Sequence, residues 1–532
     1  MRHCVLLSAT LALTALVAPA AEVAAPAPLP DIEALAVVLI PDLRETLNHI
    51  EDVAGTVAPG TLAPGQLADQ LGQMLQDPGL ANLAPGAVVM AVAPDVLLPA
   101  VAVLVPTVEG ELYAKAAELA GFGAVVAEGH VILFQAGNLK AEELGQRLSA
   151  DYATLAAQAG TADVRLIASP QRVGKAYGMM AQGFYMQTVR QAAAKQGDAG
   201  KALLAMQQLY SQALLSMIGD VPVIQYDLRI AADAVSIEAL IGASGGLAKA
   251  LTPSTAPSKA GEHLGAGDSI MAVQGTYPAG LATYAAEQMA VLQKKPGGKE
   301  LITPELLDLM RAWPTAFGTD LAMRMNSTAE APYTMSAVGA VKDQAAATKL
   351  FAAAQAMQRA DTGMGAMNKQ MGLSSTVAAN VRTVGGLSVS RTTMTIADDA
   401  SPQAKQMAAM AVVAGTMEYA FGPTWYFAAS QPAELDRMIT NKPAPAPLAA
   451  QTVIGAGRDG YGQMDIVGLM QMSMHMLTLA GQPAPMAGIT DAATGAPISL
   501  AWTSGRGCAR VEWHIPYAGF QAIGQAMRGG GF

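Results

Sequence analysis

Three short segments of the sequence carry residue types that could bind a cofactor, act as a nucleophile or hold a metal. The first is Gly455-Ala-Gly457-Arg-Asp-Gly460, which lies between a predicted strand at 451–454 and a predicted helix. In dinucleotide-binding domains such glycines let the backbone approach a pyrophosphate at a helix N-terminus. Here the pattern comes near the end of the chain, and a predicted hairpin rather than a parallel strand follows the helix. We therefore expect a glycine-rich turn and no cofactor.

The second segment, Gly242-Ala-Ser244-Gly-Gly246, fits the Gly-x-Ser-x-Gly turn that exposes a serine nucleophile in esterases. His263, His475 or His514 would then act as the general base. The predicted helix behind Ser244 is shorter than such a turn normally carries, because a proline soon ends it. The sequence therefore favours a plain turn and no catalytic residue. A serine hydrolase that uses Ser244 stays as an alternative hypothesis.

The third segment is a predicted helix at about 463–479 that is rich in methionine. Met472, His475 and Met476 have i, i+3, i+4 spacing, so they share one helix face. Thioether and imidazole are soft ligands that suit copper(I). However, the chain has 30 methionines, and methionine commonly fills irregular gaps in a core. We predict no metal site, with a copper-binding protein that uses these three residues as a second alternative.

Composition excludes several classes of function. The chain has 532 residues, 52% hydrophobic and 14% charged, with a net charge of −10. So apolar a chain has enough material for a large buried core, and it does not have the composition of a disordered protein. A nucleic-acid partner is not expected, because phosphate contacts need clusters of Lys and Arg that this sequence lacks.

The first residues have the features of a secretory signal peptide. A short basic start is followed by an apolar stretch and then Ala18-Pro19-Ala20, a small-x-small cleavage pattern. We predict a signal peptide at 1–20, a flexible lead at 21–30, and a periplasmic or secreted protein. The apolar run at 86–108 is broken by prolines, so it predicts two buried strands and no transmembrane segment. Cys508 is the one cysteine left after cleavage, and we expect it to be buried.

The order of predicted elements occurs twice, which indicates an internal duplication. Each half runs from a strand and two helices through a hairpin and a helix to a second hairpin, and each closes with a long hairpin. We predict repeat domains at 31–252 and 263–532, joined by a linker at 253–262. The repeated hairpins are 88–94 with 100–107 and 320–326 with 333–340, then 221–231 with 234–243 and 497–503 with 508–515.

The predicted fold class is α+β, with antiparallel sheets of hairpins covered by Ala-rich helices. Alternating apolar residues in the last hairpin favour a sheet with one solvated face. The second half carries an insertion at about 359–415. It holds a further hairpin, 376–384 with 388–396, and a Met- and Gly-rich loop at 363–372. That loop is either an adaptable contact surface or disordered.

The arrangement resembles a group of uncharacterised exported bacterial proteins known only as a domain of unknown function. The resemblance rests on the signal peptide, the opening strand and helix from residue 34, and the closing hairpin and helix that reach residue 520. It implies an exported α+β protein in two parts. No catalytic residue is known for that group, so the resemblance assigns none here.

Taken together, these features predict an exported, non-enzymatic protein that binds a hydrophobic small molecule or a protein partner. The high apolar content, with so few charges, is the positive reason for this hypothesis. The sequence does not name the ligand or the partner.

Overall fold

The structure is a computed structural model of the chain. It describes residues 23–29, 33–96, 98–194, 197–253, 257–265, 269–295, 298–327, 333–360, 363–370, 372–396, 415–444, 447–479 and 496–529. The predicted signal peptide at 1–20 lies outside these residues.

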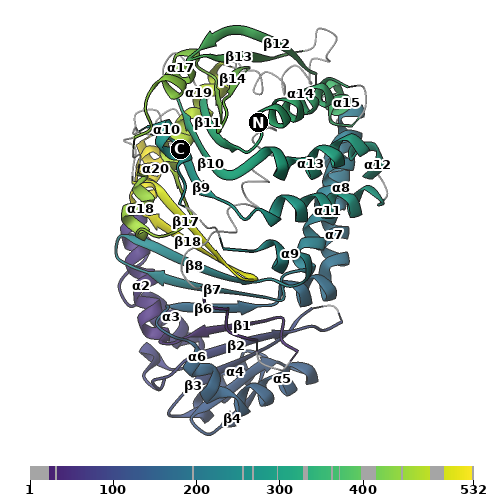
Figure 1. Cartoon of the computed structure of the whole chain (residues 1–532). Coiled ribbons are helices and arrows are strands. Elements are labelled where there is room, and N and C mark those ends of the chain that lie inside the picture. The colour runs from purple at the N-terminus through teal and green to yellow at the C-terminus, as the bar shows by residue number, and fades with distance from the viewer. Residues whose placement is uncertain are drawn as a thin grey trace.

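One continuous sheet of 18 strands runs through the described residues, and each strand is antiparallel to its neighbours (Figure 1). The fold is therefore α+β, as the sequence predicted, and one sheet holds the strands of both halves, a point that the sequence left open. From one edge to the other the strands are β4 (Phe122–Ala127), β5 (His130–Gln135), β3 (Ala100–Pro106), β2 (Val88–Ala93), β1 (Ala36–Ile40), β6 (Val164–Ala168), β7 (Val223–Ile230), β8 (Ala234–Gly242), β18 (Cys508–Pro516), β17 (Ile498–Gly505), β16 (Gly460–Met464), β9 (Met271–Thr276), β10 (Phe317–Asn326), β11 (Thr334–Val341), β15 (Trp425–Ala429), β14 (Thr416–Phe421), β13 (Leu387–Ile396) and β12 (Leu373–Val384).

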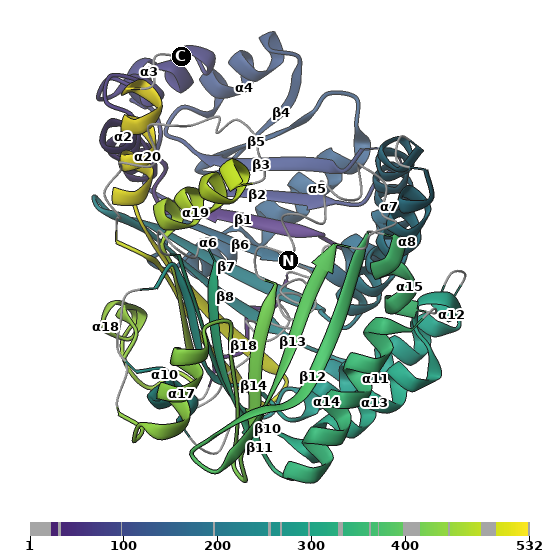
Figure 2. The ribbon, with the colours of Figure 1, turned by 90° about the horizontal axis from the view of Figure 1, so that it is seen from above.

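The strand order is the same on the two sides of the junction between β8 and β18. Outward from the junction, β8, β7, β6, β1, β2, β3, β5 and β4 on one side correspond to β18, β17, β16, β9, β10, β11, β15 and β14 on the other. The hairpin of β13 and β12 extends the second side, where the sequence predicted an insertion. Glu238 lies opposite Glu512 at the centre of this junction. Figure 2 shows that the sheet twists strongly, so that β1–β3 run across the direction of β12–β14.

Helices cover both faces of the sheet. They can do so because strand residues that point to either face are apolar. In β3, Leu104 packs on α5 and α6, whereas Val105 packs on α3 and α4. We call the side of Leu104 face A and the side of Val105 face B. The prediction of one solvated face was therefore wrong. Face A carries α5 (Leu139–Ala150), α6 (Tyr152–Gln158), α10 (Ala260–Leu264), α17 (Pro432–Thr440) and α18 (Ala449–Ile454). Face B carries α2 (Leu43–Val57), α3 (Gln66–Met74), η1 (Pro78–Leu80), α4 (Gly110–Leu119), α9 (Gly245–Ala250), α11 (Gly280–Gln293), α13 (Pro304–Ala316) and α14 (Gln344–Arg359).

A long helical hairpin stands beside the sheet. Its first helix is α7 (Pro170–Ala194), and its second is α8 (Gly197–Gly219). α8 also contacts α11 and α15 of the second half, whereas α7 contacts β7 and the loop between β2 and β3 (Figures 1 and 2). The remaining helices are α12 (Gly298–Leu301), α15 (Gly363–Gln370), α19 (Ile466–Leu479) and α20 (Ala518–Gly529).

Two segments adopt a different structure from the one predicted. The predicted strand at 451–454 is the helix α18, and residues 461–464, predicted to open a helix, belong to β16. Gly460 can lie in a strand between β9 and β17 because it has no side chain. A Cβ there would lie 1.8 Å from Cζ2 of Trp502, which packs over it. The Met- and Gly-rich loop predicted at 363–372 contains the helix α15, which lies between α14 and α8.

The predicted linker at 253–262 is packed against the second half where the structure describes it. The Ser258 hydroxyl and the backbone N–H groups of Lys259 and Ala260 all donate hydrogen bonds to the Asp320 carboxylate. Ala260 is fully buried against face A. The division into two domains stays a prediction, and the two halves share one sheet.

Candidate functional site

The glycine pattern at 455–460 lies in a turn from helix to strand. α18 precedes it and β16 follows it, which reverses the strand-to-helix order that a pyrophosphate site requires. Gly455 and Gly457 have φ values of 97° and 87°, which only glycine adopts easily. The turn therefore uses its glycines for backbone conformation. Its Arg458 forms an ion pair with Glu512 of β18.

Ser244 directly precedes the first residue of α9, as the Gly-x-Ser-x-Gly pattern predicted. Its side-chain hydroxyl, however, hydrogen-bonds to a backbone atom and not to a histidine. Its hydroxyl donates to the carbonyl oxygen of Asp220 at 3.2 Å. His514 contacts the Ser236 hydroxyl near the other end of β8. His263 packs against the rings of Trp425 and Phe427 on face A. The contacts of His514 and His263 therefore lie away from Ser244.

The methionine-rich helix is confirmed as α19, and its Met472 belongs to the core. Met472 is buried and packs against Met325, with Ile270, Met271 and Leu469 around them. His475 is half-buried, and the side chain of Met476 lies outside the described structure. Within the part of the chain that the structure describes, no three His, Cys, Asp or Glu side chains group to hold a metal. A copper site at Met472, His475 and Met476 stays the alternative to the prediction of no metal site.

Cys508 is buried, as expected, and its thiol lies 3.5 Å from the carbonyl oxygen of Val23. Burial raises the pKa of this thiol. A buried thiol of raised pKa holds little reactive thiolate at neutral pH. The N-terminal segment at 23–29 lies on face A. Val23 contacts Cys508 there, and the backbone N–H of Ala27 donates a hydrogen bond to the side chain of Gln225 of β7.

The buried carboxyl group of Asp459 is not among the candidate residues that the sequence predicted. Asp459 is 6% exposed, and its Oδ2 atom has no hydrogen-bond partner. Its backbone pairs with Thr276 on one side and Trp502 on the other, which places it between the ends of β9 and β17. Burial raises the pKa of Asp459 to about 9, so the group is neutral at pH 7. No local pattern marks this residue, because the desolvation comes from neighbouring strands.

A network of alternating charges joins the two halves of the sheet on face A. Glu238 of β8 pairs with Arg229 and Arg510, and Glu512 of β18 pairs with Arg510 and Arg458. The two central carboxylates would repel each other without these guanidinium groups. The network therefore stabilises the junction between the halves.

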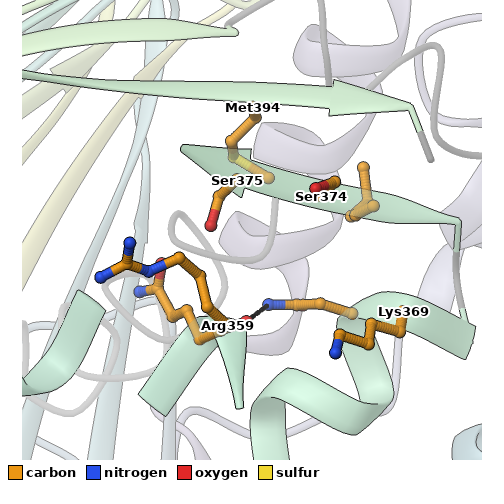
Figure 3. Close-up of a pocket in the computed structure, with 8 residues that line it drawn as sticks. Arg359, Lys369, Ser374, Ser375 and Met394 are labelled. Carbon is orange, nitrogen blue, oxygen red and sulfur yellow. Dashed lines mark hydrogen bonds between the residues drawn. The ribbon is translucent and has the colours of Figure 1, made fainter. Parts of the chain in front are cut away.

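A small polar pocket lies between the end of α14, α15 and the start of β12 (Figure 3). Its volume is about 120 Å³, below the roughly 300–1,000 Å³ of sites for drug-sized ligands. Figure 3 shows Arg359 and Lys369 on one side of the pocket and Ser375 on the other. This lining suits an ion or a small polar group, and the pocket is too small for the hydrophobic ligand that the sequence suggested.

Among the elements that the structure describes, α7 carries the most exposed large apolar side chains, and others lie on the loops next to it. Six of them define what we call the α7 surface, with these exposed fractions: Val96 91%, Leu98 72%, Leu139 75%, Met179 89%, Met180 46% and Phe184 64%. Exposed apolar side chains that gather on one part of a folded protein often mark an interaction site.

Asp95 ties the three segments of the α7 surface together. Its backbone N–H donates to the Tyr177 hydroxyl of α7 at 3.0 Å. Its carboxylate accepts a hydrogen bond from Asn138, the N-cap of α5, at 3.1 Å. Val96 follows Asp95, and Leu139 follows Asn138, so both apolar residues are held beside α7. The sequence predicted the hairpin of β2 and β3, but it did not show that this hairpin meets α7.

Comparisons with protein-family models, with curated proteins and with solved structures find no match to this chain. Among the helices that the structure describes, none is both long enough and apolar enough to cross a bilayer. The function therefore has to be argued from the geometry of the chain's own surfaces.

Proposed function

We propose that this chain is an exported binding protein, without catalytic activity, that engages a hydrophobic partner through the α7 surface. The observation that carries the proposal is the exposure of large apolar side chains from three segments held together by Asp95. Each such side chain gains about 1.5–3 kcal/mol when it is fully removed from water. A partner that covers several of them therefore gains substantial free energy.

The geometry of the other candidates supports the binding role over the two alternatives. The Ser244 hydroxyl donates its hydrogen bond to a carbonyl oxygen, whereas a serine nucleophile needs a general base within about 3 Å. Met472 packs in an apolar cluster, which is the common role of methionine in a core. The α7 surface, in contrast, has no evident role in packing.

We also infer that the two halves arose by duplication, which is the origin that the sequence suggested. The support is the matching order of eight strands on each side of the junction between β8 and β18. The corresponding helices match as well, since α5 and α17 both follow the second strand of the second hairpin, on face A. In the first half the α7 and α8 hairpin follows β6, and in the second half the structure describes α19 up to residue 479 after β16.

Photocrosslinking tests the proposed binding role. A benzophenone amino acid replaces Met179 in the full chain, and the protein is irradiated in cells that export it. A matched control places the same group at Met74, which is 73% exposed but lies on α3. We expect discrete adducts, to protein or to lipid, from position 179 only. Equal adduct yields from the two positions would count against the proposal.

A further inference from the structure

We propose that the partner of the α7 surface is a phospholipid bilayer that contains anionic lipids, to which the chain binds peripherally. This inference rests on the proposed function, because it names the partner for the same surface. It is argued from the orientation of α7, the charges on α7 and the shape of the exposed side chains.

The helix α7 packs on α8 through glycines, while several of its large apolar side chains are exposed. Its small residues face the protein: Gly174 and Gly178 pack on α8, and a Cβ on Gly178 would lie 2.9 Å from Cδ2 of Leu215. Met180 lies roughly 120–160° around the helix from these glycines and Phe184 roughly 80–120°. Both are exposed, as is Met179, whereas Met186 of the same helix is buried. A helix normally turns its apolar stripe to the core. The close glycine seam instead leaves Met179, Met180 and Phe184 exposed on the remaining sides of α7.

The charges on α7 complement an anionic surface. The helix contains Arg172, Lys175 and Arg190 and neither Asp nor Glu, although the whole chain has a net charge of −10. Lys140 follows Leu139 at the start of α5 and is also exposed. Basic residues beside Phe and other apolar side chains are the features of helices that lie in the headgroup region of a membrane. Each basic residue near an anionic bilayer adds roughly 1 kcal/mol of attraction.

The shape of the surface also suits a bilayer. Val96 and Leu98 stand on the loop between β2 and β3, and Met179 stands on α7, each exposed by more than 70%. Side chains this exposed protrude from the chain. A fluid headgroup region accommodates protruding apolar side chains without a shaped complementary pocket.

Vesicle flotation of the purified full chain tests the inference. The chain is mixed with vesicles of phosphatidylcholine that contain phosphatidylglycerol, and with vesicles of phosphatidylcholine alone. We expect the chain to float with the anionic vesicles and to bind them less as salt rises, because salt screens the attraction. The double variant Met179→Ser and Phe184→Ser should lower the partition coefficient at least about tenfold, since two inserted side chains are lost.

The matched control is Met74→Ser with Val108→Ser, two residues exposed by 73% and 75% outside the α7 surface. This control should change the partition coefficient less than about twofold. Lys175→Glu with Arg190→Glu should weaken binding to anionic vesicles at low salt, without loss of folded structure by circular dichroism. Both test positions are exposed, so all variants should fold.

Two results would overturn the inference. The first is a wild-type chain that stays unbound with anionic vesicles at low salt. The second is vesicle binding that the Met179 and Phe184 variant leaves unchanged. If the crosslinker at position 179 nevertheless forms adducts with a protein, the proposed binding role stands and only the lipid assignment fails. If neither vesicles nor crosslinks involve this surface, both proposals fail.

Discussion

Replacing Glu418 with Gln should weaken the attachment of the β12 and β13 hairpin to the sheet. Glu418 lies on β14 with no exposed side-chain surface. Its Oε2 atom accepts from Arg382 of β12, at 2.9 Å from Nε and 2.6 Å from Nη2. Its Oε1 atom accepts from Arg391 of β13, at 3.0 Å and 2.6 Å. One buried carboxylate therefore binds two arginines from two neighbouring strands.

The size of the effect follows from this geometry. Hydrogen bonds to charged groups contribute about 1.5–3 kcal/mol each. The glutamine oxygen keeps some of them, and the side chains of Arg382 and Arg391 are 27% and 43% exposed, so both can be partly hydrated. We therefore expect a loss of about 3 kcal/mol, at the lower end of the range for breaking a buried ion pair.

The loss should depend on pH. Burial raises the pKa of Glu418, but hydrogen bonds and charges from Arg382 and Arg391 outweigh it and hold the pKa below the ordinary 4.5. A carboxyl whose pKa is lowered by folding contributes stability above its unfolded pKa and loses it as pH falls through the folded value. The difference between wild type and variant should therefore be full at pH 7 and shrink below about pH 4.

Urea unfolding followed by circular dichroism at pH 7 and at about pH 2–3 measures this difference. The control is Asp308→Asn, the same carboxylate-to-amide change in an exposed pair with Arg311. An exposed pair contributes at most about 1 kcal/mol. If Glu418→Gln costs no more than the control at pH 7, the hairpin does not depend on this carboxylate and the reasoning is refuted.

Three further predictions concern the other sites. Folding raises the pKa of Asp459 from 3.8 to about 9, so its contribution to stability is full below pH 3.8 and declines as pH rises through the folded value. Asp459→Asn should therefore be more stable than wild type at pH 8, by up to about 5 kcal/mol, and nearly equal at pH 4. Urea unfolding that shows a less stable variant at pH 8 would contradict this. Gly460→Ala should lower the free energy of unfolding by about 2–3 kcal/mol in the same assay, because the new Cβ would clash with the buried Trp502. Gly457→Ala should lower it by about 1 kcal/mol, because the new side chain has free space and only the φ of 87° is strained. Equal losses would show that the contact with Trp502 is unimportant. A serine-reactive phosphonate should leave the wild-type chain unlabelled by mass spectrometry, and labelling that is lost on Ser244→Ala would establish the hydrolase instead.

The hairpins were predictable because their signals are local. The strands of β2 and β3 are apolar runs on either side of Pro94 and Pro99, and both strands were placed within a residue or two. The β12 and β13 hairpin was found from alternation around Gly385 and Gly386, whose φ values of 56° and 82° form the turn. Turn residues and strand periodicity act over a few residues, so a single sequence records them.

The errors lie where a distant contact decides the local structure. Residues 460–464 form a strand because β9 and β17 pair with them on both sides, and Gly460 tolerates this because Trp502 fills the space a side chain would need. Neither partner is close in sequence. Read locally, the same glycines resembled a cofactor-binding turn.

The candidate site was the least predictable part. In the sequence, methionine-rich helices indicate core packing, whereas Met179 and Met180 are exposed. Only the seam at Gly174 and Gly178 turns these methionines outward. The hydrogen bonds of Asp95 to Tyr177 and Asn138 then bring two loops beside the helix.

By itself, the sequence determined the α+β class, the repeated order of elements, most of the strand boundaries and the burial of Cys508. These depend on apolar periodicity and on proline and glycine, which act through the backbone of a few neighbouring residues. The tertiary structure alone decided that both halves share one sheet, that Glu238 and Glu512 meet at its centre, that helices cover both faces, and that the α7 surface is exposed. Those outcomes depend on which segments far apart in the chain come into contact, and such contacts leave no fixed spacing in the sequence.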